Sequence, residues 1–187
     1  MTKNKQEHSA SKPEGYLDSI MRRDPAASSK WAVFWLYPSV RIMRRYRIAH
    51  FLYVKWHWRF LAEAIMMRGK RITGIEIHPE AKIGRNLFID HGSNVVIGQT
   101  AEIGDNCTLY HGVTLGGVSS RKVKRHPTLG NDVVVGAGAI LLGPIKIGDG
   151  AKIAPNTVIR KDVEAGDIAF SDELKIPGRN KKGILDR

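Results

Sequence analysis

The chain has 187 residues, a single cysteine, 42% hydrophobic residues and a formal net charge of +12. This length and apolar content predict one folded domain with a smaller appendage and exclude a chain that is disordered throughout. The single cysteine excludes an intrachain disulfide and favours a reducing compartment.

Residues 1–15 are polar and lack the apolar core of a secretory signal, so we expect a disordered lead and a cytoplasmic protein. In residues 16–73, apolar side chains recur three and four positions apart between arginines, which is the period of helices. Pro25 and Pro38 divide this region into about three expected helices, and Ser39 is the expected N-cap of the longest, about 40–68. Four tryptophans are expected in the core or at an interface: Trp31, Trp35, Trp56 and Trp58.

The positive charge is concentrated in the first part of the chain. Residues 1–73 contain 15 Lys/Arg and 5 Asp/Glu, whereas residues 74–187 contain 15 and 13. The densest apolar stretch, 31–38, is too short to span a bilayer, and no nucleic-acid motif accompanies the basic helices. We therefore expect no membrane partner and no nucleic-acid partner.

After Gly74 an aliphatic residue recurs every six positions, a period typical of a β-solenoid with triangular coils of 18 residues. The series is Ile77, Ile83, Ile89, Val95, then Ile97, Ile103, Leu109, Leu115, then Leu129, Val135, Leu141, Ile147, Ile153 and Ile159. The expected fold is α+β, a helical region followed by a left-handed parallel β-helix of hexapeptide repeats over 74–168, with a tail over 169–187.

The six-residue phase breaks twice. A slip of two residues between Val95 and Ile97 places His91 and His111 at the same position of successive coils. The polar run 116–128 is too long for one face of the solenoid, which predicts one protruding loop. Cys107 occupies a position that small, inward side chains usually fill, so we expect its side chain to be buried in the core and not to act as a reactive thiol.

Six stretches identify a resemblance beyond the repeat itself. They are RRDPAA (22–27), TGIEIHPEAKIG (73–84), FIDHG (88–92), GVTLGG (112–117), KRHPTLG (124–130) and GAGAILLGPIKIGDGAKI (136–153). Through them the chain resembles the serine O-acetyltransferases over roughly residues 16–168. The resemblance implies transfer of acetyl from acetyl-CoA to L-serine in cysteine biosynthesis, without a metal. We expect a homotrimer, and a dimer of trimers stays open.

The resemblance also implies roles for the residues that would carry the reaction. A serine hydroxyl is a poor nucleophile at neutral pH and needs a positioned base, which would be His91. Glu76, at a position where aspartate is common in the family, would orient the imidazole and stabilise its charged form. The backbone N–H of Gly117 would stabilise the oxyanion and lie near the thioester.

The same resemblance divides the substrate contacts between acids, cations and the acetyl-CoA groove. Asp24 and Asp90 would hold the serine ammonium, and Arg125 with His126 would meet its carboxylate. Two residues would contact acetyl-CoA: Ala137 through its backbone and Lys152 near the phosphates. His78 precedes a proline at a coil corner, and we interpret it as structural.

Three features depart from the family pattern: His111 in place of a common glutamine, Val118 in place of a usual threonine, and the divergent tail. The family binds the next enzyme of its pathway, a sulfhydrylase, through a terminal isoleucine. Here Ile184 lies three residues before the end, so we expect that complex to be weak or absent.

Three alternatives remain open from the sequence. His91 and His111 could bind zinc in a lyase similar to γ-class carbonic anhydrases, although the histidine spacing of that class is missing. An acetyltransferase with another small hydroxylated acceptor and a catalytically silent scaffold are the other two.

Overall fold

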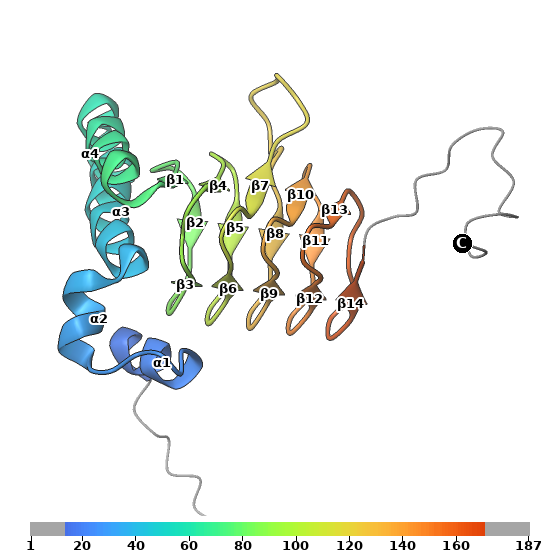
Figure 1. Ribbon diagram of the computed structural model, residues 1–187. Coiled ribbons are helices and arrows are strands. Elements are labelled where there is room, and N and C mark those ends of the chain that lie inside the picture. Colours follow the sequence, from blue (N-terminus) through green and yellow to red (C-terminus); the bar gives the residue numbers. More distant parts are fainter. Residues whose placement is uncertain (1–13, 171–187) are drawn as a thin grey trace, which may run out of the picture.

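The computed structural model describes residues 14–170, and in this range four helices are followed by fourteen short strands (Figure 1). The helices are α1 (Tyr16–Arg23), α2 (Lys30–Leu36), α3 (Pro38–Lys55) and α4 (Arg59–Thr73). Ser29 caps α2, because its hydroxyl accepts a hydrogen bond from the Ala32 N–H at 3.2 Å. Gly74 ends α4 in the left-handed conformation, with φ of 72°.

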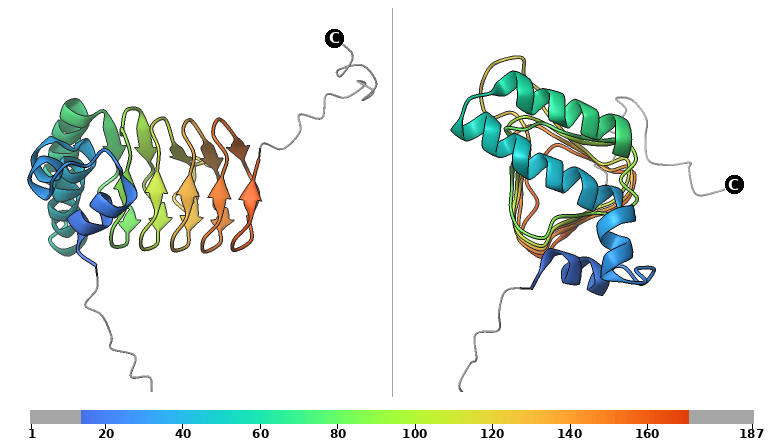
Figure 2. Two further views of the ribbon diagram at one scale, coloured as in Figure 1. Left: turned by 60° about the horizontal axis from the view of Figure 1, so that its bottom comes forward. Right: turned by 90° about the vertical axis from the view of Figure 1, so that its left-hand side faces the viewer.

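The strands form three parallel sheets that wind as a β-helix, which confirms the predicted solenoid. Sheet A contains β1 (Ile75–Ile77), β4 (Val95–Ile97), β7 (Thr114–Gly116), β10 (Ile140–Leu142) and β13 (Val158–Ile159). Sheet B contains β2 (Lys82–Ile83), β5 (Glu102–Ile103), β8 (Thr128–Leu129) and β11 (Lys146–Ile147). Sheet C contains β3 (Phe88–Ile89), β6 (Thr108–Leu109), β9 (Val134–Val135), β12 (Lys152–Ile153) and β14 (Ile168–Ala169). Figure 2 shows the coils stacked along one axis.

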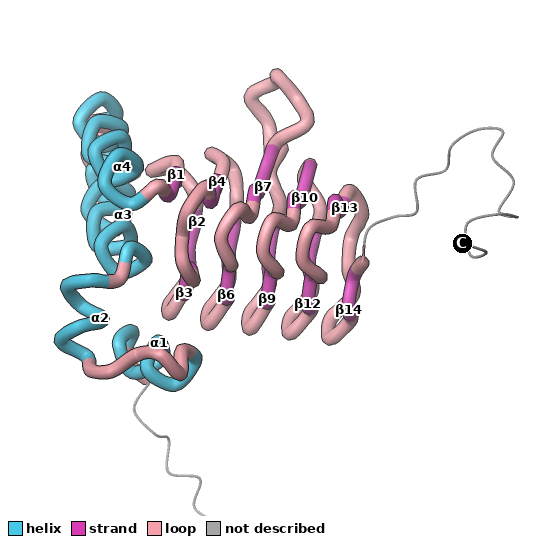
Figure 3. The backbone as a smooth tube through the Cα atoms, in the orientation of Figure 1, coloured by secondary structure: helices cyan, strands magenta, loops and turns pink. Residues whose placement is uncertain are grey.

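The register reproduces both predicted breaks of the six-residue phase. Ile77 pairs with Ile97, an interval two residues longer than the 18 between Ile97 and its partner Leu115. Leu115 pairs with Leu141, and the extra residues of that interval form the loop that leaves the coil between β7 and β8 (Figure 3).

The predicted aliphatic positions form the interior of the solenoid, where each is at most 7% exposed. Cys107 is fully buried, and its thiol donates to the Gly130 carbonyl at 3.1 Å. Burial raises the pKa of the Cys107 thiol to about 11, so the reactive thiolate is disfavoured. This confirms the interpretation of Cys107 as packing.

Helices α3 and α4 lie across the first coil and replace the coil that would precede it (Figure 2). In the regular stack, Lys82 N–H donates to the Ala101 carbonyl and Gly84 N–H to the Ile103 carbonyl. The corresponding carbonyls of the first coil, at Ala81 and Ile83, have no preceding coil. They accept instead from the Tyr46 hydroxyl at 2.5 Å and from the Arg47 guanidinium at 2.8 Å.

The expectation that Ser39 is an N-cap is wrong. Pro38 occupies the first position of α3, where proline is favoured because its missing N–H needs no partner there. Tyr37 is therefore the N-cap residue, and Ser39 is buried one position further into the helix.

The single helix expected over 40–68 is also wrong, because α3 ends at Lys55 and α4 begins at Arg59. Between them His57 adopts a left-handed φ of 56°, and the Trp58 N–H donates to the Leu52 carbonyl at 3.1 Å. The chain thus turns back on itself, which brings α4 against α3.

The four tryptophans are not part of the core. The exposed fractions are 74% for Trp31, 52% for Trp35, 53% for Trp56 and 55% for Trp58. Their expected role at an interface stays a prediction.

The disordered lead expected over 1–15 and the tail expected over 169–187, which contains Ile184, lie outside the described residues except for 14–15 and 169–170. Within residues 14–170, no helix combines the length and apolar character needed to cross a membrane.

Candidate active site

The two-residue slip forms an outward turn where sheet C passes into sheet A. His91, Gly92 and Asn94 have positive φ values of 57°, 79° and 57°. A positive φ is unfavourable for residues other than glycine, and such strain is often found at functional positions. The Asp90 carboxylate supports the turn by accepting from the His91 N–H at 2.9 Å.

The turn directs the His91 side chain into solvent, where 71% of it is exposed. Its Nε2 lies 3.8 Å from Oδ2 of Asp90, and its ring centre lies 5.6 Å from that of His111 on the next coil. The prediction that His91 and His111 occupy the same position of successive coils is therefore confirmed, with the two rings edge to face. Among residues 14–170, no group of three or more His, Cys, Asp or Glu side chains is arranged to hold a metal.

Helix α1 brings Asp24 to the same turn. Asp24 is the C-cap of α1, and its Oδ1 accepts from the Ala26 N–H at 2.8 Å. Its Oδ2 accepts from the Tyr37 hydroxyl at 2.5 Å. Burial, the hydrogen bond to Asp24 and the negative charges of Asp24 and Asp90 raise the pKa of Tyr37 to about 12. We call Asp24, Tyr37, Asp90 and His91 the acidic corner.

Sequence reasoning missed Tyr37, although the Tyr-Pro pair that separates α2 from α3 was a usable signal. Pro38 restricts the preceding residue to extended backbone, and Tyr37 has φ of −73° and ψ of 122°. A tyrosine at such a fixed point holds its ring in a defined direction.

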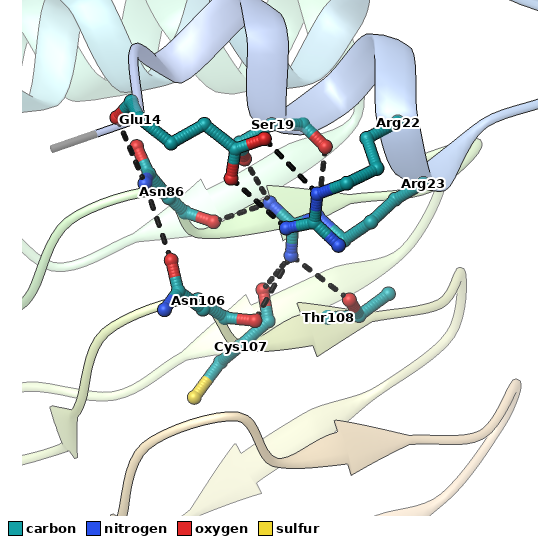
Figure 4. A network of polar contacts seen from close by, with 8 residues as sticks. All are labelled: Glu14, Ser19, Arg22, Arg23, Asn86, Asn106, Cys107 and Thr108. Atoms are coloured by element: carbon teal, nitrogen blue, oxygen red, sulfur yellow. Dashed lines mark hydrogen bonds and ion pairs between the residues drawn. The ribbon is translucent and has the colours of Figure 1, made fainter. Parts of the chain in front are cut away.

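Arg23, directly before Asp24, fixes α1 to the solenoid (Figure 4). Its guanidinium donates hydrogen bonds of 2.5 to 3.1 Å to oxygens of Ser19, Asn86, Asn106, Cys107 and Thr108. Within residues 14–170 no carboxylate forms an ion pair with it, and burial lowers the pKa of Arg23. Its acceptors belong to α1 and to two successive coils, so Arg23 positions the end of α1 over the acidic corner.

The protruding loop brings together Gly117, Arg125 and His126, which we call the basic corner. This corner lies where the strands of sheet A end, whereas the acidic corner lies where they begin. A side chain at position 117 would lie 3.1 Å from Nε2 of His126 and 3.2 Å from Arg125, so only glycine leaves this space free. The N–H of Gly117 has no hydrogen-bond acceptor within residues 14–170. Arg125 donates to the Ser119 carbonyl at 2.9 Å and to the Gln99 side chain at 3.3 Å.

His126 is 7% exposed and is held in one tautomer. Its Nδ1 accepts from the Thr100 N–H at 3.1 Å, which requires an unprotonated Nδ1 and places the ring proton on Nε2. Burial, followed by the positive charges of Arg125 and Lys124, lowers the pKa of His126. The Nε2–H therefore faces Gly117 as a neutral donor.

Glu76 is on β1, and its carboxylate forms an ion pair with Lys70 of α4 at 2.5 Å. It lines a surface hollow together with His78. Burial is the largest cause of the lowered pKa of His78, and the charges of Glu80, Glu63 and Glu76 oppose that shift. Within residues 14–170 no hydrogen bond or ion pair joins Glu76 to His91. The expected orientation of the base by Glu76 stays a prediction.

The two residues expected to contact acetyl-CoA lie further along the solenoid. Ala137 precedes Gly138 at the edge between sheets C and A, and its carbonyl accepts from the Asn156 N–H at 2.8 Å. Its own N–H has no acceptor within the described range. Lys152 is exposed on β12 in sheet C. His78 accepts from the Glu80 N–H at 3.1 Å and packs against Tyr53, and its structural role stays a prediction.

Sheet A separates the acidic corner from the basic corner. The run from Val95 to Gly98 spans roughly 10 Å at about 3.3 Å per residue. His91 lies before this run, and the ring of His126 covers Gly98 at its end, where a side chain would lie 2.1 Å from the ring. One small acceptor cannot contact both histidines of the same chain.

Two family models match the solenoid, described as "Hexapeptide repeat of succinyl-transferase" over residues 80–116 and "Bacterial transferase hexapeptide (six repeats)" over 126–161. A serine acetyltransferase of Helicobacter pylori (strain ATCC 700392 / 26695) is 54% identical over 159 residues, which cover 85% of this chain and 92% of that protein. A serine acetyltransferase of Bacillus subtilis (strain 168) is 47% identical over 163 residues, 87% of this chain and 73% of that protein.

Solved structures agree with the sequence comparisons. Soybean serine acetyltransferase complexed with serine superimposes with a TM-score of 0.81 at 38% identity, over 84% of this chain and 64% of that one. Neisseria gonorrhoeae serine acetyltransferase gives 0.79 at 36% identity, over 81% and 58%. The chain thus spans about three fifths of these longer solved chains. Since it matches nearly the whole Helicobacter pylori protein at more than half of the aligned positions, this chain belongs to the serine acetyltransferase family.

Proposed function

We propose that the chain transfers the acetyl group of acetyl-CoA to the hydroxyl of L-serine, giving O-acetyl-L-serine and CoA. The observation that carries the proposal is the 54% identity to the Helicobacter pylori enzyme over 92% of its length. The distribution of charge supports it, because a zwitterionic acceptor needs acids at one end and cations at the other. Nothing in the comparisons or in the site favours the zinc lyase.

In the proposed reaction, His91 takes the proton from the serine hydroxyl while the oxygen attacks the thioester carbonyl. The new C–O bond leaves a negative charge on the carbonyl oxygen, which the free N–H of Gly117 stabilises. The C–S bond then breaks, and the CoA thiolate takes the proton from the His91 imidazolium. Serine gains the acetyl group, CoA leaves as a thiol and the base is restored.

The acceptor is held at both of its charged groups. Asp24 and Asp90 take the ammonium beside His91, where each still has oxygen lone pairs free for it. Arg125 and the Nε2–H of His126 take the carboxylate. Charge-assisted bonds of this kind are the stronger class of hydrogen bond, which suits a small substrate with few contacts.

For acetyl-CoA, we propose that the free N–H of Ala137 donates to the pantetheine arm and that Lys152 approaches the phosphates. The half-buried position of Ala137, between Gly136 and Gly138, lets a ligand approach the backbone closely. Lys152 is exposed on β12, as a phosphate contact requires.

We propose that the complete site forms between two copies of the chain in a homotrimer. The acidic corner of one copy would meet the basic corner of its neighbour, since sheet A separates them within one chain. Glu76 and His78 line the same surface hollow. In the proposed trimer, Glu76 would release Lys70 and orient His91 of the neighbouring copy. A dimer of trimers and the sulfhydrylase complex stay open in this proposal.

The decisive experiment follows CoA release from acetyl-CoA with L-serine, homoserine, O-phosphoserine or no acceptor, together with the mass of the product. Turnover with L-serine that yields O-acetylserine supports the proposal. Faster turnover with homoserine would assign a different acceptor. An absence of turnover with every acceptor by a folded protein would overturn the proposal in favour of a silent scaffold.

A further inference from the structure

Tyr37 is held more firmly than its place between two helices requires. It is the C-cap of α2 and the N-cap of α3 at once. Its N–H donates to the Val33 carbonyl at 3.3 Å, and its carbonyl accepts from the Arg41 N–H at 3.2 Å. With Pro38 next in the chain, the backbone of Tyr37 has little freedom to rotate.

Among residues 14–170, the one hydrogen bond of the hydroxyl at the end of this ring is the 2.5 Å bond that it donates to Oδ2 of Asp24. The other oxygen of Asp24 accepts from the Ala26 N–H at 2.8 Å, so each carboxylate oxygen has a hydrogen bond that restricts rotation of the side chain. The backbone of Asp24 is fixed as the C-cap of α1, because its N–H donates to the Ile20 carbonyl at 2.9 Å. Tyr37 adds a restraint on the side chain, from a residue outside that helix.

A tyrosine hydroxyl is protonated at neutral pH, and burial with the two nearby carboxylates raises the pKa of Tyr37 further, to about 12. It is therefore a permanent donor to Asp24. The turn that carries Asp90 and His91 is adjacent, since a side chain at Gly92 would lie 3.7 Å from Pro38. The Tyr37–Asp24 bond thus lies beside the carboxylate of Asp90.

We propose that Tyr37 is a positioning residue for the acceptor, because its hydroxyl fixes the Asp24 carboxylate where that carboxylate receives the ammonium of the amino acid. This inference rests on the proposed function. It predicts that loss of the hydroxyl weakens the use of acceptors with an ammonium group and leaves the acetyl-CoA side of the reaction unchanged.

The test compares Tyr37→Phe with Tyr46→Phe in the full chain. Tyr46 is a matched control, since its hydroxyl also joins the helical region to another element but lies on the Ala81 carbonyl, away from the acidic corner. Steady-state kinetics are measured for L-serine and for acetyl-CoA, and thermal unfolding records the stability of each variant. Wild-type turnover with L-serine is established first, so failure of the proposed function is seen separately.

For Tyr37→Phe we expect kcat/KM for L-serine to fall roughly 10-fold, the lower end of what a hydrogen bond to a charged group contributes. KM for acetyl-CoA should stay within twofold of the wild type. The loss should disappear in an Asp24→Asn background, where there is no carboxylate to hold, and with 3-hydroxypropanoate, which lacks the ammonium. Tyr46→Phe should lower the unfolding temperature without changing the preference between these acceptors.

Two results would overturn the inference. One is kcat/KM for L-serine within twofold of the wild type in Tyr37→Phe. The other is an equal loss with L-serine and with 3-hydroxypropanoate, which would mean that Tyr37 supports the fold alone.

Discussion

The acidic corner and the basic corner lie at opposite ends of the strands of sheet A, but they are built in different ways. The acidic corner joins the solenoid to the helical region, because Asp24 and Tyr37 come from the helices and Asp90 and His91 from a coil. The basic corner comes from the solenoid and its loop alone. The first therefore depends on how the helices dock, whereas the second depends on a local loop that folds back onto Thr100.

The charges of the two corners are opposite, as a zwitterion requires, yet sheet A separates them. In the proposed reaction, each corner supplies only part of the site. A change at the acidic corner should affect the base and the ammonium, and a change at the basic corner should affect the carboxylate. The following predictions test this division.

The largest effect is expected for His91→Asn. We expect kcat to fall by roughly 10² to 10⁴, because a positioned general base contributes about that much. Binding of acetyl-CoA, measured by calorimetry, should change little. His111→Asn is the matched control, since this imidazole has the same place on the next coil, and its kcat should stay within a few fold of the wild type. Retained turnover in His91→Asn would assign the base elsewhere.

Replacing Arg23 tests whether docking of the helices maintains the acidic corner. Arg23→Gln removes most of a buried set of hydrogen bonds from a charged group, so the free energy of unfolding should drop by at least about 2 kcal/mol. Urea unfolding measures this, and KM for L-serine should rise in the folded fraction. Arg22→Gln, one residue earlier, removes only an exposed ion pair with Glu14 and should have little effect on either quantity. Equal stability of the two variants would contradict the anchoring role.

At the basic corner, Arg125→Ala should lower kcat/KM for L-serine by roughly 10 to 150-fold, the value of a charge-assisted hydrogen bond. KM for acetyl-CoA should stay unchanged, and the loss should shrink with serine amide, which lacks the carboxylate. Lysine should restore only part of the activity, because it cannot offer the planar guanidinium. Arg121→Ala, an exposed cation of the same loop, is the control. If Arg125→Ala instead lost affinity for acetyl-CoA alone, the loop would be assigned to the phosphates of acetyl-CoA.

The smallest expected effect is a change in how the free energy of unfolding depends on pH. Because the pKa of His126 is lowered from 6.5 in the folded state, unfolded chains bind more protons just below that value. The contribution of His126 to the free energy of unfolding is therefore complete above pH 6.5. It is lost as the pH falls toward the pKa of His126 in the folded state. Between pH 7.5 and 5.5, the free energy of unfolding measured in urea should therefore decrease less in His126→Gln than in the wild type. His57→Asn, at an exposed position, should keep the wild-type slope.

The periodic half of the molecule was predictable from the sequence because each hexad meets the same steric demand. The series from Ile77 to Ile159 predicted the interior, and its two phase breaks predicted the turn at His91 and the loop before His126. The residues of the basic corner were predictable together because one short loop carries Arg125 and His126 back to Gly117.

The helical half was less predictable, because its apolar pattern continues without interruption through residues 56–58, where His57 reverses the chain. Tyr37 and Arg23 lie beside predicted features, but the sequence pattern indicates no role for either. Tyr37 acts on an aspartate 13 residues away, and Arg23 bonds mainly to carbonyl oxygens. Carbonyl acceptors have no signature in a sequence, so such contacts become visible only in the folded chain.

The way that α3 covers the first coil has a consequence for self-association. A parallel solenoid whose first coil is bare offers a row of unpaired carbonyls to any passing strand, which is the route to end-to-end fibres. Tyr46 and Arg47 occupy that row with side chains, which cannot extend it as another coil would. Growth along the solenoid axis is thereby disfavoured at this end of the molecule.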